Sequence, residues 1–464
     1  MTRWRVATAA AAAVAAAGVA TAASLAAAAA TSAAAVGATA RRDGPHAHLP
    51  LLDVERRALA ERIRGAPPGE PVHFDVAEWL DAMKNYHVEL SAAELDVLAR
   101  GGTHDAVTAG LEGVRLAGLA SVRAVPAPFT NGLCTTDYRT RKEVGDMWAG
   151  ERWAWTQAML ALHRLQSPGN VTAYEQLVIL HRANSAQAHG SVQFLPWHYF
   201  FLIILETALR AIDPTVTLPY WAWSRDAAAP HTAPVWGDWF LGKTVSGECI
   251  TTGPFANWTT NTPTAHCVLR GFTSGPAPGG FMDFPVEDEA TVDALVANGN
   301  LSFADWAETW EIAHGGPHIA IGGLGVRGDM FRVSRSPNDP AFYVHHAYVE
   351  KVWRARQAAH GYAYTGLHAG APVSVNDVLV PFDLPVWRAV WDRCVWYQPT
   401  RRAFPGGAPT PSGRTSRSAR ARKAAILKQF FRENGVLANV AKVDKAQEVL
   451  AQAADDAAEA AAAA

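Results

Sequence analysis

The pattern of apolar and polar positions predicts a mainly α-helical protein, because apolar residues recur at the three- and four-residue spacing of a helix face. The predicted helices cover residues 139–165, 174–182, 196–212, 304–313 and 340–360. In the first of them, Trp148, Trp153 and Leu160 are expected to face inward. Residues 236–280 are rich in Gly, Pro and Thr, which is typical of long loops.

The N-terminal flank has a different composition. Residues 1–40 begin with Arg3 and Arg5, continue as an Ala-rich apolar run and end in small residues, which is typical of a signal peptide or targeting segment. An uncleaved anchor helix and an organelle transit peptide share this outline. We expect a protein that is secreted or lies in an organelle lumen, with no stable membrane association after processing. Residues 41–130 are predicted to be a helical N-terminal extension or a propeptide.

The C-terminal flank is predicted to consist of two parts. Residues 401–423 are rich in Pro, Gly, Ser and Arg, which indicates a linker. Residues 424–464 have helical propensity and end in an Ala/Asp/Glu run, so the tail is expected to be either helical or disordered. The region between the flanks, 131–400, is predicted to be the central domain.

Composition and net charge limit the class of protein to which the chain can belong. With 49% hydrophobic and 18% charged residues, the chain is typical of a globular protein. A net charge of −2 gives no reason to expect a nucleic-acid partner. The oligomeric state is not predicted by these features.

The four cysteines are even in number and none has CxxC spacing, which favours disulfides over a zinc site. Cys249 and Cys267 lie in one loop-like stretch and form the natural first pair. Cys134 and Cys394 would then tie the two ends of the central region together. Free buried thiols are the alternative.

Two clusters of histidines are the candidate chemistry. In the first, His181 ends a predicted helix, His198 lies in the first turns of the next helix, and His189 lies in the loop between them. A helix, a loop and a second helix can present three imidazoles to one point. A single buried histidine is usually a core residue, but two such clusters are hard to explain in that way.

The second cluster contains His314, His318 and the adjacent pair His345 and His346. His314 and His318 are four apart and would share one face of a helix. The Gly-Gly-Pro residues 315–317 between them disfavour the interior of a helix, so we expect a helix start or a tight turn there. Spacing does not choose between His345 and His346, since adjacent helix residues point about 100° apart.

Sites made only of imidazoles suit copper, zinc, iron or nickel. Three neutral imidazoles for each metal, with no carboxylate or thiolate in the motifs, favour copper, whereas zinc with three histidines stays open. Residue types alone leave these two metals as alternatives.

Two longer motifs resemble the tyrosinase family. FLPWH, FLIILETALR and LPYWAW, after His181, are similar to its copper-A half. HGGPHIAIGG and SPNDPAFYVHHAYVEKVW, from His314 onward, are similar to its copper-B half, and the resemblance covers roughly 131–398. It implies a four-helix bundle core that houses a dicopper centre, with long loops and few short strands. It also implies oxidation of small o-diphenols to o-quinones with dioxygen as co-substrate, and in tyrosinases hydroxylation of monophenols.

The resemblance also implies roles for individual residues. The copper ligands would be His181, His189 and His198 for copper A, and His314, His318 and His346 for copper B, with His345 beside them. Glu311 lies where some family members have a glutamate that orients a water for phenol deprotonation. Gly315 replaces an asparagine that often holds this water in tyrosinases, which favours catechol oxidation over monophenol hydroxylation.

Other residues are expected around this site. Phe194 and Ile319 are expected beside the metals, and Ile319 could touch a substrate ring. Glu350 stands where the family commonly has aspartate, so it keeps a carboxylate there. Gln187 replaces a cysteine that in some members forms a thioether to the loop histidine, so His189 must be held by packing and hydrogen bonds.

Two other functions stay open. A haemocyanin-like protein would bind dioxygen at the same histidines without turnover, and a structural protein would carry a decayed site. The tail raises a further hypothesis, since a C-terminal piece could cover the copper site, although a disordered solubilising tail fits equally well.

Overall fold

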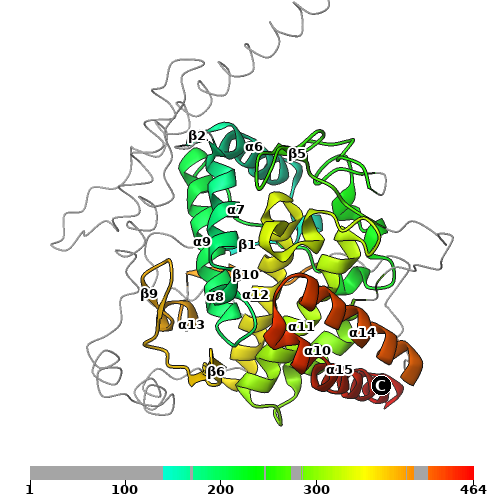
Figure 1. The fold of residues 1–464 in the computed structure, drawn as a ribbon. Helices are drawn as coiled ribbons and strands as arrows, with labels where there is room; N and C mark the ends of the chain where they lie inside the picture. The colour runs from blue at the N-terminus through cyan, green and yellow to red at the C-terminus, as the bar shows by residue number, and fades with distance from the viewer. Residues whose placement is uncertain are drawn as a thin grey trace, which may run out of the picture.

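The structure is a computed structural model that describes residues 139–167, 171–244, 247–272, 284, 286–392, 394–401 and 416–463. The predicted targeting segment, the N-terminal extension and most of the predicted linker lie outside these residues. Within them the protein is mainly helical with few short strands, as predicted (Figure 1).

Four helices form the core bundle, with further helices packed around it. The bundle helices are α7 (Ala173–Ala183), α9 (Phe194–Ile212), α11 (Phe303–Gly322) and α12 (Ala341–His360). The others are α6 (Ala149–Arg164), α8 (Ser185–Ala188), α10 (Glu289–Ala297), α13 (Trp387–Val390), α14 (Arg417–Glu433) and α15 (Leu437–Ala463). Short 3₁₀ helices cover Val144–Asp146, Trp223–Asp226, Pro230–Thr232, Pro234–Trp236, Asp329–Phe331 and Val333–Asn338.

The strands form five separate two-stranded pairs. The parallel pair β1 (Arg139–Arg141) and β10 (Val395–Tyr397) joins the two ends of the central region. The antiparallel pairs are Gln166–Ser167 with Val171–Thr172, Thr259–Thr260 with His266–Cys267, Leu367–His368 with Ala371–Pro372, and Val378–Leu379 with Leu384–Pro385. These strands are too short to form a sheet layer, so helix packing determines the fold.

Local sequence explains where the bundle helices begin. Thr172 caps α7, since its hydroxyl accepts from the Glu175 N–H at 3.1 Å while the Glu175 carboxylate accepts from the Thr172 N–H at 2.7 Å. Ser302 caps α11 by accepting from the Asp305 N–H at 3.1 Å.

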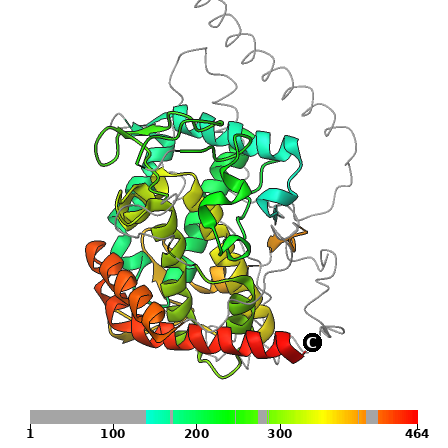
Figure 2. The same cartoon turned by 90° about the vertical axis from the view of Figure 1, so that its right-hand side faces the viewer.

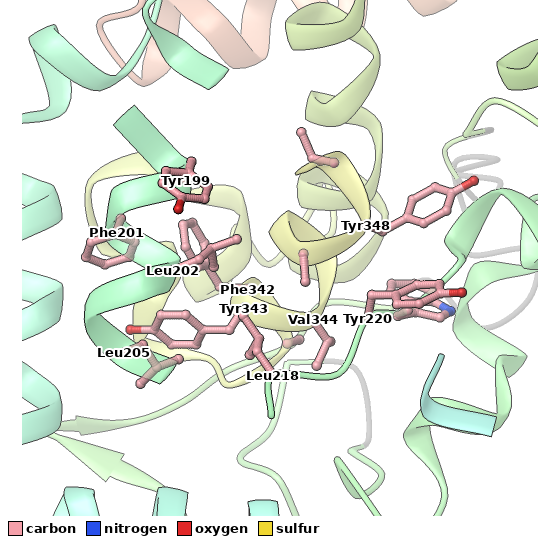
Figure 3. Packing of buried hydrophobic residues seen from close by; sticks show 14 of the residues in the cluster. Tyr199, Phe201, Leu202, Leu205, Leu218, Tyr220, Phe342, Tyr343, Val344 and Tyr348 are labelled. Atoms are coloured by element: carbon pink, nitrogen blue, oxygen red, sulfur yellow. The ribbon is translucent and has the colours of Figure 1, made fainter. Parts of the chain in front are cut away.

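The helix α9 lies at the centre of the bundle. Its length and apolar composition would suffice to cross a membrane, but 89% of that window is buried inside the protein, as in a core helix. Figure 3 shows Phe201 and Leu202 of α9 in one cluster with Phe342 and Tyr343 of α12, and the ring centroid of Phe201 lies 5.9 Å from each of those two rings. This packing brings the first histidine cluster next to the second.

The prediction of a helix over residues 139–165 is partly wrong. Residues 139–141 form strand β1, and the helix begins only at Ala149. Trp148 and Trp153 are 67% and 52% exposed, so they do not face inward. The buried face of α6 is instead formed by Trp155, Met159 and Leu162, which follow helical spacing.

The prediction for residues 315–317 is also wrong, because α11 continues through them as a helix to Gly322. Both glycines are closely packed. A Cβ on Gly315 would stand 3.3 Å from Phe431 Cζ, and one on Gly316 would stand 3.4 Å from Val286 Cγ1. Tertiary packing against the small faces of these residues therefore offsets their poor helix propensity.

The tail is helical, and its first helix begins earlier than predicted. The α14 helix begins at Arg417 because the Ser416 hydroxyl accepts from the Ala419 N–H at 3.2 Å, so residues 417–423 are helix and not linker. We call α14 and α15, residues 416–463, the C-terminal hairpin. Figures 1 and 2 show it, in orange and red, packed along one end of the molecule against α10 and α11.

Three of the four cysteines lie within the described residues, and all three are disulfide-bonded. Cys249 and Cys267 form the predicted disulfide. Cys394 is also disulfide-bonded, and its predicted partner Cys134 lies outside the described residues. The predicted alternative of free thiols is therefore wrong for these three cysteines.

Candidate metal centre

The first histidine cluster is assembled as predicted from a helix, a loop and a second helix. His181 comes from the last turn of α7, His189 follows α8, and His198 lies in the second turn of α9. One ring nitrogen from each lies within 4.8 Å of the others, and all three side chains are buried. A single metal ion between them could therefore contact all three imidazoles.

The second cluster has four members. His314 and His318 lie on one face of the continuous helix α11, and His345 and His346 lie on α12. One ring nitrogen from each lies within 4.8 Å of the others. The prediction that the glycine-rich motif converges two imidazoles is thus confirmed, although it does so from the middle of a helix.

Backbone carbonyls orient four of these imidazoles through Nδ1. The partners are Ser185 O for His189 at 3.0 Å, Phe194 O for His198 at 2.9 Å, Met330 O for His318 at 2.8 Å, and Glu311 O for His314. A carbonyl oxygen only accepts, so Nδ1 carries the hydrogen in each. The Nε2 lone pair is then left for a metal ion, which is the usual arrangement of a ligating histidine.

Burial keeps the imidazoles neutral. It lowers the pKa of His189 and of His318 to about 4, and it holds the pKa of the other five well below the usual value. Neutral imidazole is the form that binds a metal ion.

Several ring nitrogens in the two clusters are buried without a hydrogen-bond partner. They include His198 Nε2, both nitrogens of His181 and His346 Nδ1. A buried polar atom without a partner is unfavourable by roughly 1–3 kcal/mol. A metal ion in each cluster would supply a partner for one nitrogen of each ring, so the residues present fit two copper ions.

The two clusters face each other directly. The rings of His198 and His346 stack with centroids 4.4 Å apart and planes at 14°. Phe194 lies beside both clusters, with its ring 4.6 Å from that of His198 and 4.4 Å from that of His314. The arrangement therefore places two metal positions side by side, and not at separate sites.

Both histidines of the adjacent pair approach the second cluster. His346 Nε2 lies 3.3 Å from His318 Nε2, and its ring faces the first cluster. The His345 ring stacks parallel to that of His314, with centroids 5.7 Å apart, and lies 6.1 Å from the ring of Trp223.

Glu311 is fully buried one turn before His314. Its Oε1 accepts from the Gly190 N–H at 2.7 Å, and the side chain of Asn439, from α15, lies beside it. Burial raises the pKa of Glu311 to about 7, against the lowering effect of these two neighbours. A carboxyl group with this pKa can both hold and release a proton near neutral pH.

The comparisons with known proteins agree with this geometry. A family model described as the common central domain of tyrosinase matches residues 171–359. A tyrosinase of Streptomyces antibioticus is 30% identical over 265 residues, which cover 52% of this chain and 92% of the relative. A tyrosinase of Streptomyces glaucescens is 32% identical over 271 residues, with the same two shares. The chain belongs to the tyrosinase family.

Among solved structures, a polyphenol oxidase variant from Thermothelomyces thermophila is similar at 22% identity with a TM-score of 0.45, covering 69% of this chain and 98% of that one. The family match contains all seven clustered histidines and Glu311. The C-terminal hairpin of this tyrosinase-family chain lies after the matched range.

The hairpin covers the second cluster of this tyrosinase-family protein. A Cβ on Gly315 would have Phe431, Phe430 and Leu427 of α14 as its nearest neighbours, at 3.3, 3.5 and 3.7 Å. The Phe430 ring lies 6.3 Å from that of His318. Ile319 is buried in the same apolar cluster as these residues, so in this state it packs on the hairpin.

Polar contacts from α14 and from its C-cap residue strengthen this cover. Asn434 Oδ1 accepts from the Val333 N–H at 2.8 Å, and its Nδ2 donates to Phe331 O at 3.0 Å. Lys423 pairs with Glu287 at 2.5 Å. No motif or helical spacing in the sequence marks Phe430, Phe431 or Asn439 as residues of the site.

Glu350 is bound to arginines. Its carboxylate pairs with Arg141 at 2.7 Å and with Arg354 at 3.2 Å. Arg141 also pairs with the buried Glu206 at 2.8 Å, as does Arg139 at 3.1 Å. Glu350 thus anchors α12 to strand β1 through this network.

Proposed function

We propose that this protein is a copper-dependent phenol oxidase that converts small o-diphenols to o-quinones with dioxygen. The observation that carries the proposal is the direct facing of two buried histidine clusters across the His198 and His346 rings. Two redox-active ions side by side suit the removal of two electrons from one catechol.

The proposed ligands are His181, His189 and His198 for copper A, and His314, His318 and His346 for copper B. Copper, when bound there, exchanges electrons between the phenol and dioxygen. The protein holds each imidazole neutral and fixes its direction through backbone carbonyls.

Glu311 is the proposed proton acceptor. Oxidation of two catechols to two o-quinones releases four electrons and four protons, which reduce one dioxygen to two waters. With a pKa of about 7, Glu311 can accept one of these protons near neutral pH. Gly315 has no side chain to hold a water beside Glu311, so diphenol oxidation is proposed ahead of monophenol hydroxylation.

We propose that the enzyme is latent in the state described here. The aromatic residues of α14 lie over Gly315 and beside His318, and α15 lies beside Glu311. A phenol could reach the clusters from this side only after the hairpin moves or is removed. Cleavage within 402–415, just before the hairpin, would be one route.

The test compares copper content and catechol oxidation before and after limited proteolysis. We expect copper bound at both clusters, slow quinone formation by the full chain, and faster formation after cleavage. His198→Ala should abolish turnover, whereas His360→Ala, which removes an exposed histidine outside the clusters, should not. A copper-loaded and cleaved protein that leaves catechol unchanged contradicts the proposal.

A haemocyanin-like oxygen carrier is the second candidate, favoured by the covering of the site. It predicts reversible oxygenation of the copper-loaded protein without quinone formation, before and after cleavage. Oxygen uptake measured with and without catechol separates the two functions.

We further propose secretion or delivery to an organelle lumen, on the pattern of residues 1–40. Fractionation of the native host with detection of the protein outside the cytosol tests this. No nucleic-acid or stable membrane partner is proposed.

A further inference from the structure

Both backbone polar groups of Gly190, which directly follows His189, are hydrogen-bonded to side chains of other elements. Its N–H donates to Glu311 Oε1 on α11 at 2.7 Å. Its carbonyl accepts from Lys442 Nζ on α15 at 3.0 Å. The loop that carries a candidate ligand is thus held partly by the C-terminal hairpin.

We infer that α15 is a positioning element for copper A, acting through Lys442 on the His189–Gly190 loop. The inference rests on the proposed role of His189 as a copper ligand. The hairpin would then have two roles, because it covers the second histidine cluster and also positions a ligand of the first.

Close packing between the Gly190 loop and α15 supports the inference in addition to the hydrogen bonds. Gly190 has a φ of +84°, a conformation that glycine adopts readily. A Cβ there would stand 3.1 Å from Ala438 Cβ and 3.6 Å from Val436 Cγ1. The loop therefore lies directly against the start of α15, and a side chain at this position would push the two apart.

Lys442 is itself fixed in place. Its ammonium group pairs with Glu308 Oε1 on α11 at 2.8 Å while it donates to the Gly190 carbonyl. A charged donor held by a carboxylate forms a stronger hydrogen bond than a neutral one. Lys442 thus connects α15, α11 and the loop at one point.

The other contacts of the loop come from the core. The His189 Nδ1 donates to Ser185 O at 3.0 Å, and Ser191 Oγ contacts His368 Nδ1 at 2.9 Å. These contacts remain if the hairpin leaves. Loss of α15 would therefore loosen the loop on one side without unfolding it.

The test compares two lysines of α15 in the full chain. Lys442→Met removes the donor to Gly190 but keeps an apolar stem. Lys445→Met removes the same charge one turn away, where the lysine pairs with Asp305 at the surface. We expect a chelator to remove one of the two coppers about 10- to 100-fold faster from Lys442→Met, the range typical of residues that orient a metal ligand. Lys445→Met should lose copper at the wild-type rate, and Lys442→Arg should restore most of the retention.

Wild-type copper retention in Lys442→Met overturns the inference, whether or not protease sensitivity shows that the hairpin has been released. In that case, two bound coppers and catechol oxidation by the wild type would still uphold the proposed function. A wild type that binds no copper at either cluster overturns both.

Discussion

Phe431 of α14 lies directly over Gly315 of α11, with Cζ of its ring 3.3 Å from where a Cβ of residue 315 would be. Gly315 follows the candidate ligand His314 in the chain. The contact places an aromatic side chain of the tail next to the second histidine cluster.

Phe431→Ala is expected to weaken the docking of the hairpin and raise activity. Truncating a buried phenylalanine destabilises by about 3 kcal/mol. If about half or more of this loss weakens the docking of the hairpin, the fraction of molecules with an undocked hairpin rises about 10- to 100-fold, since each 1.4 kcal/mol is a factor of ten. The measurement is the initial rate of catechol oxidation in buffer with added copper.

The control for Phe431 is Phe240→Ala, which removes a buried ring that packs on Trp155, with centroids 4.9 Å apart. It should lower the free energy of unfolding without raising the rate. Equal activation by both variants would mean that general loosening, and not release of the hairpin, exposes the site.

The sixth copper ligand is expected to be His346. Its ring faces His198 across the two clusters, whereas His345 lies towards Trp223. His346→Ala should lose the copper-B ion, and His345→Ala should keep both ions with altered activity. Copper content per chain after dialysis is the measurement, and the reverse outcome would assign the ligand to His345.

Glu206→Gln is expected to destabilise the fold. Burial alone would raise the pKa of Glu206, but Arg141 and Arg139 hold it at about 2. Removing one partner of a fully buried ion pair leaves the other charge uncompensated, which lowers the free energy of unfolding by about 3 kcal/mol or more. Urea unfolding measures the loss.

A surface pair provides the comparison for Glu206. Glu151 pairs with Lys142 where both side chains are partly exposed, so Glu151→Gln should change stability by less than about 1 kcal/mol. Similar effects of the two substitutions would show that burial of the Glu206 network contributes little.

His266 is expected to make stability depend on pH. Its hydrogen bond to Asp329, at 2.9 Å, raises the pKa of His266, and the other ring nitrogen faces Thr264 O, so the doubly protonated ring satisfies both acceptors. Because the pKa of His266 is higher in the folded than in the unfolded protein, its protonation stabilises the fold. This stabilisation is complete below the unfolded pKa of about 6.5 and is lost as the pH rises through the pKa in the folded protein.

The measurement is the difference in unfolding free energy between the copper-free wild type and His266→Gln at pH 5 and at pH 9. The free energy of unfolding of the wild type should exceed that of the variant by about 1 kcal/mol at pH 5 and by less at pH 9. The difference is small because the His266 side chain is partly exposed to solvent. A constant difference would mean that the charge of His266 does not contribute.

The bundle and the histidine clusters could be predicted because their signals are local. Helical periodicity indicated α7, α9 and α12, and short motifs placed the histidines on or next to them. The loop pair Cys249 and Cys267 was predictable for a similar reason, since both lie in one stretch.

The errors arise where tertiary packing overrides local preference. The helix through residues 315–317 is stabilised by Phe431 and Val286, and no helix propensity indicates these partners. The exposed Trp148 and Trp153 show the same limit, because apolar composition alone did not show which face of α6 is buried. The contact between Asn439 and Glu311 joins residues far apart in the chain and leaves no periodic signal in either segment.

The C-terminal hairpin follows all seven clustered histidines along the chain. A ribosome therefore completes both clusters before it makes the helices that cover them. During that interval copper could reach the histidines from the surrounding solution or from a carrier, and docking of the hairpin would then cover the site and hold the His189–Gly190 loop. Translation order by itself would thus separate metal delivery from substrate entry, with the first possible during synthesis and the second only after the hairpin is released.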